Sequence, residues 1–195
     1  DTLALIYNRD DFDNAGIPLA PKTWSEFEND VVKLRKVNPS TNEILKSAAA
    51  IGGSSQSINR ATDLLSLLML QLGTQMTDSG FFQATFTQGF SQDSGSPPGL
   101  QALNFYAQFA NPRSPYYTWD EDLHYSIDNF QEEGVSMIFN YAYQAAQLKE
   151  RNPFLKYAVA PMPQPNSTDN AVNFANYWGL AVSNQSNNSA VAHEF

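Results

Sequence analysis

Cysteine is absent from the 195-residue sequence, and histidine occurs only twice, at His124 and His193. The lack of cysteine excludes disulfides, thiolate metal sites and cysteine nucleophiles. A hydrolase triad needs a base held beside its nucleophile, and neither histidine lies in a motif that would supply one. The G-x-S-x-G, P-loop and Rossmann fingerprints are missing as well. We therefore expect no catalytic residue, no metal site and no cofactor.

Basic residues and long apolar runs are also scarce. The chain carries 11 Lys and Arg against 20 Asp and Glu, a formal net charge of -9. Such a charge repels phosphate backbones, so nucleic acid is not an expected partner. The longest apolar run, residues 64–72, falls well short of the roughly 20 residues needed to cross a bilayer. We expect no direct membrane insertion of this segment.

Aromatic residues, in contrast, are plentiful. They make up 13% of the chain while charged residues make up only 16%, and the Tyr and Phe are set among Asn, Gln and Ser. This mixture suits an uncharged, polyhydroxylated ligand, because its C–H faces stack on rings and its hydroxyl groups bond to amides. An aromatic core would give the same composition, so composition alone does not choose between the two readings.

Apolar runs and helical spacings alternate along the chain, and they predict strands and helices respectively. The spacing of Thr23 and Glu26 is that of a capping box, which marks one helix start. The predicted strands are 3–7, 47–51, 135–139, 156–160 and 179–182; the predicted helices are 8–16, 24–37, 58–72, 99–110, 127–133, 143–151 and one beginning at 189. Residues 75–98 are predicted to be irregular, with at most one short hairpin. This order indicates an α/β domain with a largely parallel sheet flanked by helices.

Two aromatic clusters fall beside predicted strands. Asn140, Tyr141 and Tyr143 follow the carboxyl end of strand 135–139, and Tyr177 and Trp178 stand at the entrance of strand 179–182. Ligands of open α/β sheets bind outside the carboxyl ends of the strands. We therefore expect the first cluster to face a ligand crevice and not the core. If the second cluster is adjacent, the two form a wall for stacking.

An acidic run, Asp120 to Asp122 with His124 nearby, raises the question of a metal site or of glycosidase carboxylates. Both need convergent geometry, whereas consecutive side chains in a polar loop diverge. We interpret this run as a solvated loop. The neighbouring Trp119 is interpreted as an anchor of that loop and not as a ligand platform.

Three segments, taken in order, resemble one known family. They are LALIYNRDDFDNAGIPLAPKTWSEFENDVVKL, NFQEEGVSMIFNYAYQ and YWGLAVSNQSNNSAVAHEF. The first is similar to the pattern of a strand, YN-K/R-D, a short helix ending in AGI, and P-K/P-T-W in the extracellular solute-binding proteins of bacterial ABC importers. The second and third are similar to the F-x-x-G-x-x-A-M and G-x-x-I/V-S segments of that family, in the carbohydrate-binding group that includes the maltose-binding protein.

The resemblance implies a periplasmic-binding-protein-like (type II) lobe without enzymatic activity. It implies that residues 1–195 are mostly the C-terminal lobe of a two-lobed protein, truncated at both ends. The full-length parent would act outside the cytoplasm, in the periplasm or as a cell-surface lipoprotein. It would bind a mono- or oligosaccharide in the cleft between its lobes and deliver it to ABC transporter permease subunits.

The resemblance also implies ligand contacts, position by position. Tyr143 stands where a sugar-stacking aromatic follows the M-x-x-N strand, and Asn140 with Tyr141 occupies the turn that faces the cleft. Trp178 and Gly179, with Tyr177 beside them, begin a strand whose leading edge touches ligand. Gln71 ends helix 58–72, where the family presents a polar or aromatic contact. The alternatives are a glycan-degrading enzyme or its accessory module, and a binder of peptides or polyamines.

Overall fold

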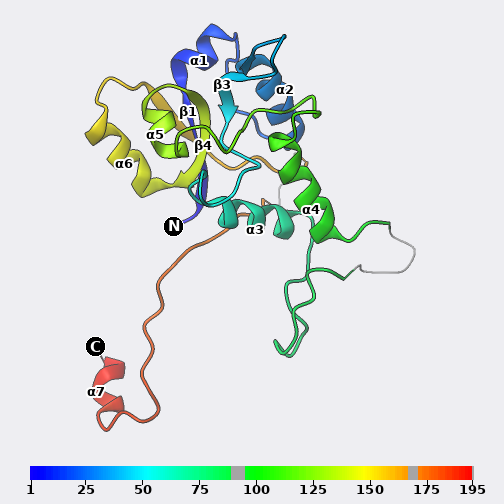
Figure 1. Ribbon diagram of the computed structural model, residues 1–195. Helices are drawn as coiled ribbons and strands as arrows, with labels where there is room; N and C mark the ends of the chain where they lie inside the picture. The colour runs from blue at the N-terminus through cyan, green and yellow to red at the C-terminus, as the bar shows by residue number, and fades with distance from the viewer. Residues whose placement is uncertain (89–94, 167–170, 195) are drawn as a thin grey trace.

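Five strands form one sheet in the order β2-β3-β4-β1-β5. The computed structural model describes residues 1–88, 95–166 and 171–194 (Figure 1). The strands are β1 (Leu3–Asn8), β2 (Lys36–Val37), β3 (Ile44–Ala49), β4 (Val135–Tyr141) and β5 (Tyr157–Ala160). Every residue of β4 is buried, because β4 lies inside the sheet and is covered on both faces.

The direction of the strands differs from the prediction. β3 and β4 are parallel, but β1 is antiparallel to both β4 and β5, and β2 is antiparallel to β3. The α/β class with flanking helices is confirmed, whereas a largely parallel sheet is wrong, because the sheet is mixed. A continuous apolar run indicates that a strand is buried on both faces, and it says nothing about the direction of its neighbours.

Helices cover both faces of this sheet. The helices are α1 (Arg9–Asn14), α2 (Trp24–Leu34), α3 (Ala61–Gln71), α4 (Pro98–Ala107), the 3-10 turn η1 (Gln108–Ala110), α5 (Ser126–Gln131), α6 (Ala142–Arg151) and α7 (Ser189–Glu194). Of these, α7 lies away from the sheet, at the end of the C-terminal segment (Figure 1). α5 and α6 lie on one side of the sheet, and α2 and α4 lie on the other (Figure 1). The prediction extended α2 to Val37. The helix ends at Leu34, because the backbone adopts an extended conformation at Arg35, and Val37 belongs to β2.

The first turn of α2 has the predicted cap. Thr23 Oγ1 accepts a hydrogen bond from the Glu26 backbone N–H at 3.2 Å. The Glu26 carboxylate reaches back to the backbone N–H of Lys22 at 2.6 Å, one residue before the position that a capping box uses. The helix then buries Trp24, Phe27, Val31 and Leu34, the positions that face the sheet.

An aromatic cluster fills the space between α2, α4 and the sheet. The Phe27 ring lies 5.4 to 5.6 Å from the rings of Trp24, Phe109 and Phe139, all in tilted or edge-to-face geometry. Trp119 is also fully buried, as expected of a loop anchor. For these rings the core reading of the aromatic composition is correct.

The segment after Phe174 departs from the prediction. Residues 179–182 have no strand partner, so the predicted strand is wrong, and the chain runs from the sheet to α7 without regular structure (Figure 1). Its apolar side chains are exposed, with Trp178 at 99% and Leu180 at 96%. An apolar run becomes a strand only where another strand offers its backbone groups, and this run finds none within the described residues.

Within the described ranges, no helix is both long enough and apolar enough to span a bilayer.

We predict that Thr23→Ala destabilises the domain by about 1 kcal/mol, because the Glu26 N–H loses its acceptor at the start of α2. Thr23→Ser keeps the hydroxyl and should retain most of the stability. Urea unfolding followed by circular dichroism measures both variants. Equal midpoints for the alanine and serine variants would show that this cap contributes nothing.

Candidate functional site

Two parallel neighbours, β3 and β4, end at the same edge of the sheet. Register pairs Ala49 with Met137, so the loop of residues 52–60 after β3 lies beside the end of β4, at Asn140 and Tyr141, and beside Tyr143 in the first turn of α6. The antiparallel β1 begins at this edge, because Leu3 pairs with Tyr141. We call this edge, with the residues that follow β3 and β4, the site edge. Ligands of α/β sheets bind at such an edge.

The loop of residues 52–60 is held close to the core. The Tyr106 hydroxyl donates to the Gly53 carbonyl at 2.6 Å, and the Trp119 indole N–H donates to Ser57 Oγ at 3.1 Å. Gly53 has no room for a larger residue, since a Cβ there would lie 2.7 Å from the Trp119 ring. These contacts give the loop a fixed path across the sheet edge.

The far half of the loop is fastened to the segment that leads into α5. The Asn59 backbone N–H donates to Ser126 Oγ at 2.9 Å, and the Asn59 amide donates to the Tyr125 hydroxyl at 2.8 Å. From β4, the Asn140 amide donates to Asn59 Oδ1 at 3.0 Å. Asn59 therefore joins the ends of both parallel strands.

Arg60 occupies the centre of the cluster. It precedes α3 in the left-handed region, with φ at 64°, a conformation that is uncommon for a residue other than glycine and is often found at functional sites. Its guanidinium donates to the Tyr143 hydroxyl at 2.5 Å and lies 5.1 Å from the centre of the Tyr141 ring. The hydrogen bond to Tyr143 raises the pKa of Arg60, so the group stays charged.

Asp63, one turn into α3, balances this charge. Its Oδ2 lies 3.8 Å from the Arg60 guanidinium and accepts a hydrogen bond from the Tyr141 hydroxyl at 2.8 Å. Burial, and then the bond to Asp63, raise the pKa of Tyr141 to about 12, so this phenol remains protonated at neutral pH. Arg60 and Asp63 together leave the cluster without net charge.

Of the three residues predicted to face a crevice, the structure exposes one. The side chain of Tyr143 is 45% exposed, whereas Asn140 and Tyr141 are buried at 0% and 1%. For these two residues the expectation of a crevice position outside the core is wrong. Both lie inside the last residues of β4, whose backbone continues two residues beyond the predicted end. Asn140 and Tyr141 position Asn59 and Asp63 through their hydrogen bonds, while the ring of Tyr143 is exposed to solvent.

Gln71 lies at the opposite end of α3 from Arg60. Its Oε1 accepts from the Trp24 indole N–H at 2.6 Å, and its amide N–H groups donate to the carbonyls of Pro163 and Val172 at 2.9 and 3.1 Å. These bonds tie α3 to α2 and to the segment after β5. The structure does not bring Gln71 to the Tyr143 cluster, and its ligand role stays a prediction.

Tyr177, Trp178 and Gly179 leave the sheet from a point close to the cluster. Asn176 exchanges backbone hydrogen bonds with Asp1, and its side chain lies against the Tyr141 hydroxyl. The next two side chains are 81% and 99% exposed, and no atom lies within 4 Å of a Cβ built on Gly179. Their ligand role also stays a prediction.

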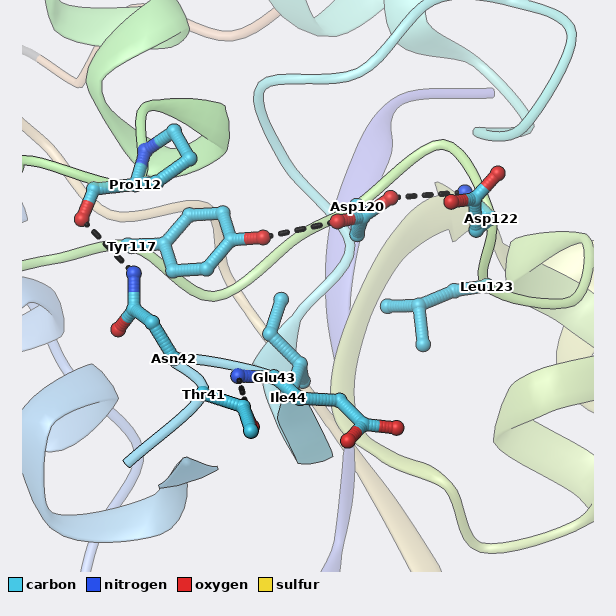
Figure 2. Close-up of a pocket in the computed structure, with 9 residues that line it drawn as sticks. All are labelled: Thr41, Asn42, Glu43, Ile44, Pro112, Tyr117, Asp120, Asp122 and Leu123. Atoms are coloured by element: carbon cyan, nitrogen blue, oxygen red, sulfur yellow. Dashed lines mark hydrogen bonds between the residues drawn. The ribbon is translucent and has the colours of Figure 1, made fainter. Parts of the chain in front are cut away.

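The acidic run serves the loop that crosses the site edge. Glu121 accepts from the Ser54 backbone N–H at 2.5 Å, and Asp120 accepts from the Tyr117 hydroxyl and from the Asp122 N–H, both at 2.9 Å. Asp120 and Asp122 line a hollow of about 440 Å³ beside the amino end of β3, with Glu43 and Tyr117 (Figure 2). Because the hollow adjoins the start of β3, it lies away from the carboxyl ends that form the site edge.

The polar and aromatic cluster thus lies at the carboxyl ends of parallel strands, where α/β sheets bind their ligands. The whole chain, residues 1–195, matches the family of bacterial extracellular solute-binding proteins. The chain belongs to this family, and the resemblance of its three segments is thereby confirmed.

The individual relatives have low sequence identity to this chain. A binding protein of Brucella abortus (strain 2308) is 25% identical over 168 residues, which are 82% of this chain and 35% of that protein. The ABC transporter solute-binding protein of Thermotoga lettingae TMO, bound to α-D-tagatose, is 21% identical, with a TM-score of 0.66 over 98% of this chain and 46% of its own. The cyclic α-maltosyl-1,6-maltose binding protein of Arthrobacter globiformis is 17% identical, with a TM-score of 0.60 over 90% and 42%. The chain thus spans less than half the length of these relatives.

The prediction missed Asn59, Arg60, Asp63 and Tyr125. The rule that pointed to Asn140 applies equally to the residues after strand 47–51, because that strand is the parallel neighbour of β4. Sequence alone does not say which strands are neighbours, so the loop of residues 52–60 could not be chosen over other loops.

We predict that Tyr141→Phe lowers the free energy of unfolding by about 1 kcal/mol at pH 7, because Asp63 loses its hydroxyl donor. The folded-state pKa of Tyr141 is raised to about 12 from the ordinary 10.0, so its contribution is fully present below pH 10 and is lost as the pH rises toward 12. The stability difference between the two proteins should therefore narrow over this range. Urea unfolding at pH 7, 10 and 11 tests it, and a constant difference would contradict the assignment.

Proposed function

We propose that this chain forms the C-terminal lobe of a two-lobed solute-binding protein and binds an uncharged carbohydrate at the site edge. The observation that carries the proposal is the half-exposed Tyr143 ring, held by Arg60 at the carboxyl ends of two parallel strands. Family membership supports it, and so do neighbours solved with sugars, such as the Thermotoga lettingae protein with α-D-tagatose.

The chemistry of the cluster suits hydroxyl groups. The face of the Tyr143 ring offers a stacking surface for the C–H face of a sugar. Arg60 retains N–H groups beyond those that meet Tyr143 and Asp63, and the Asp63 carboxylate has a second oxygen; together they offer a donor and an acceptor side by side. Since the pair is neutral, a ligand need not supply a counter-charge.

The path of the chain supports one lobe of a larger protein. Asp1 and Thr2 run antiparallel to Ala175 and Asn176 beside the cluster, so the two segments reach the site edge together. In the longer relatives more than half of the chain lies outside the part that this chain covers. We propose that these paired segments lead to the second lobe and that the parent delivers its sugar, outside the cytoplasm, to ABC transporter permease subunits.

The other function classes find less support. A glycosidase needs two carboxyl groups facing one bond, whereas Asp63 is paired with Arg60 and Tyr141, and Glu121 is bound to the Ser54 backbone. A polyamine binder would need an acidic crevice, and the charge of Asp63 is balanced by Arg60. We therefore propose a binding protein without enzymatic activity.

A thermal-shift experiment on the longer protein tests this function. The probes are α-D-tagatose, D-mannitol and maltotriose, which are bound in solved neighbours, and spermidine is the competing probe. A bound sugar raises the melting temperature by mass action. The proposal expects a shift with at least one sugar and release of no reducing sugar from maltotriose. A shift with spermidine alone, or hydrolysis, would contradict it.

We predict that Tyr143→Ala weakens the affinity for the bound sugar about tenfold, because the stacking surface is lost. Since Tyr143 is 45% exposed, the melting temperature without ligand should change little. Phe154→Ala is the matched control, because Phe154 is 91% exposed and follows the far end of α6. Isothermal titration of the three proteins measures the difference, and equal affinities for Tyr143→Ala and Phe154→Ala would remove Tyr143 from the site.

We further predict that Trp178→Ala leaves the melting temperature without ligand unchanged, because its side chain is 99% exposed and packs on nothing in this lobe. If Trp178 contacts sugar in the two-lobed protein, the same variant binds more weakly. Tyr177→Ala, at 81% exposure, provides the comparison on the neighbouring ring. A fall in melting temperature without any change in affinity would make Trp178 a contact between lobes instead.

A further inference from the structure

A short hairpin after α3 presents two neighbouring phenylalanines to solvent. Thr77 pairs with Ala84 across the hairpin, which agrees with the prediction of at most one short hairpin for the described residues of this region. Phe81 and Phe82 lie at its tip with 83% and 89% of their surfaces exposed. Exposed apolar surface that is not scattered but concentrated in one place marks an interaction site.

Hydrogen bonds within the turn fix the backbone at the tip of the hairpin, where both rings are exposed. Asp78 Oδ1 accepts from the backbone N–H groups of Phe82 and Gln83 at 2.8 and 3.0 Å, and the Asp78 N–H donates to the Gln83 carbonyl at 3.0 Å. Phe81 adopts a φ of 59°, which is unfavourable for a bulky residue. The Phe82 ring lies so close to Gly80 that a Cβ there would come within 2.6 Å of it. The turn therefore fixes the position of the exposed rings.

The base of the hairpin is anchored as firmly. Thr85 donates from its N–H to the Met76 carbonyl at 3.0 Å and from its hydroxyl to the Gln75 carbonyl at 2.9 Å. The Phe86 carbonyl packs directly on Gly99 in the first turn of α4, where any Cβ would clash with it. The two arms of the hairpin are thus joined at their base, and Phe86 places this base against the start of α4.

The hairpin lies at the opposite end of α3 from the segments that enter and leave the domain. Asp1 and Asn176 pair beside Tyr141 and Arg60, at the start of α3, and the hairpin follows the end of α3. The 11 residues of α3 separate the two by about 16 Å. The hairpin and the C-terminal segment both extend beyond the edge of the sheet at which α3 lies (Figure 1). A second lobe joined through residues 1 and 176 would therefore face the hairpin at the far side of the cleft.

We propose that Phe81 and Phe82 form a latch that packs on an apolar patch of the second lobe when that lobe closes over the ligand. The inference rests on the proposed function, and its occupant is the part of the longer protein that this chain does not contain. The relatives leave room for such a lobe, since this chain spans 46% of the Thermotoga lettingae protein. A contact made only in the closed state stabilises that state and slows the release of ligand.

The test compares three forms of the longer protein: the unchanged protein, F81S/F82S, and F154S as a control with an equally exposed phenylalanine. Affinity and dissociation rate are measured with α-D-tagatose, D-mannitol and maltotriose. F81S/F82S should bind each of these sugars that binds the unchanged protein at least about tenfold more weakly, with faster dissociation. Its melting temperature without ligand should equal that of the unchanged protein, and F154S should match the unchanged protein throughout.

Each other result overturns the latch. Unchanged affinity in F81S/F82S leaves sugar binding intact and shows that the hairpin does not act on closure. Loss of affinity for maltotriose alone makes the hairpin a ligand contact, and a lower melting temperature without ligand makes it a permanent contact between lobes. Dissociation of a dimer in F81S/F82S, seen by size-exclusion chromatography, makes the occupant a second copy. If none of the three sugars binds the unchanged protein, the proposed function fails and the latch fails with it.

Discussion

The parallel pairing of β3 with β4 is the interaction on which the candidate site depends. It brings the ends of two strands to one edge, so Asn59 meets Asn140 across 81 residues of sequence and Arg60 meets Tyr143 across 83. A shift of the register of β4 by one residue would turn Asn140 to the other face of the sheet. Because β4 is buried on both faces along its whole length, that shift would also disrupt the packing of the core, so the core protects the geometry of the site.

Several polar side chains near the site edge form hydrogen bonds to the loop of residues 52–60, so they are not available to a ligand. Trp119, Tyr106 and Glu121 are aromatic or acidic residues whose side-chain hydrogen bonds end on this loop. Glu121 thus shows why an acidic run need not be a site: its carboxylate replaces a partner that the Ser54 N–H would otherwise take from water. Glu121, in the acidic run, therefore has a structural role. Arg60, which no sequence motif identifies and whose backbone is strained, is the residue beside the exposed Tyr143 ring.

The sequence predicted the elements well and their arrangement less well, for reasons that are physical. Thr23, with its Glu26 partner, marks a helix start through local hydrogen bonds, and local bonds leave a local pattern. The direction of β1 depends on which strands it joins, and its apolar run is the same in either direction. Residues 179–182 have the composition of a strand but pair with no strand in the part of the chain that the structure describes, so propensity alone did not suffice. At the site, Tyr143 was predicted from its place after a strand, while Arg60 was missed because its role depends on a neighbouring strand that is distant in sequence.

The distribution of aromatic rings follows from the same constraint. Rings on the inner faces of α2 and α4 pack with the sheet and with one another, with ring centres 5.4 to 5.6 Å apart. Trp24 and Phe105 also line a hollow of about 320 Å³ together with Gln71. Tyr143, Tyr177 and Trp178, in contrast, lie on or just beyond the segments that meet at the site edge, where the backbone leaves the sheet and no helix covers them. An exposed ring lacks the stabilisation that burial of its apolar surface would give. A fold that leaves these rings exposed at one edge therefore keeps an apolar surface in contact with water there. Since Arg60 and Asp63 cancel each other's charge, the proposed carbohydrate would meet this surface through stacking and hydrogen bonds more than through charge. The net charge of the chain, -9, disfavours anionic partners, and the neutral cluster is compatible with the uncharged ligand that we propose.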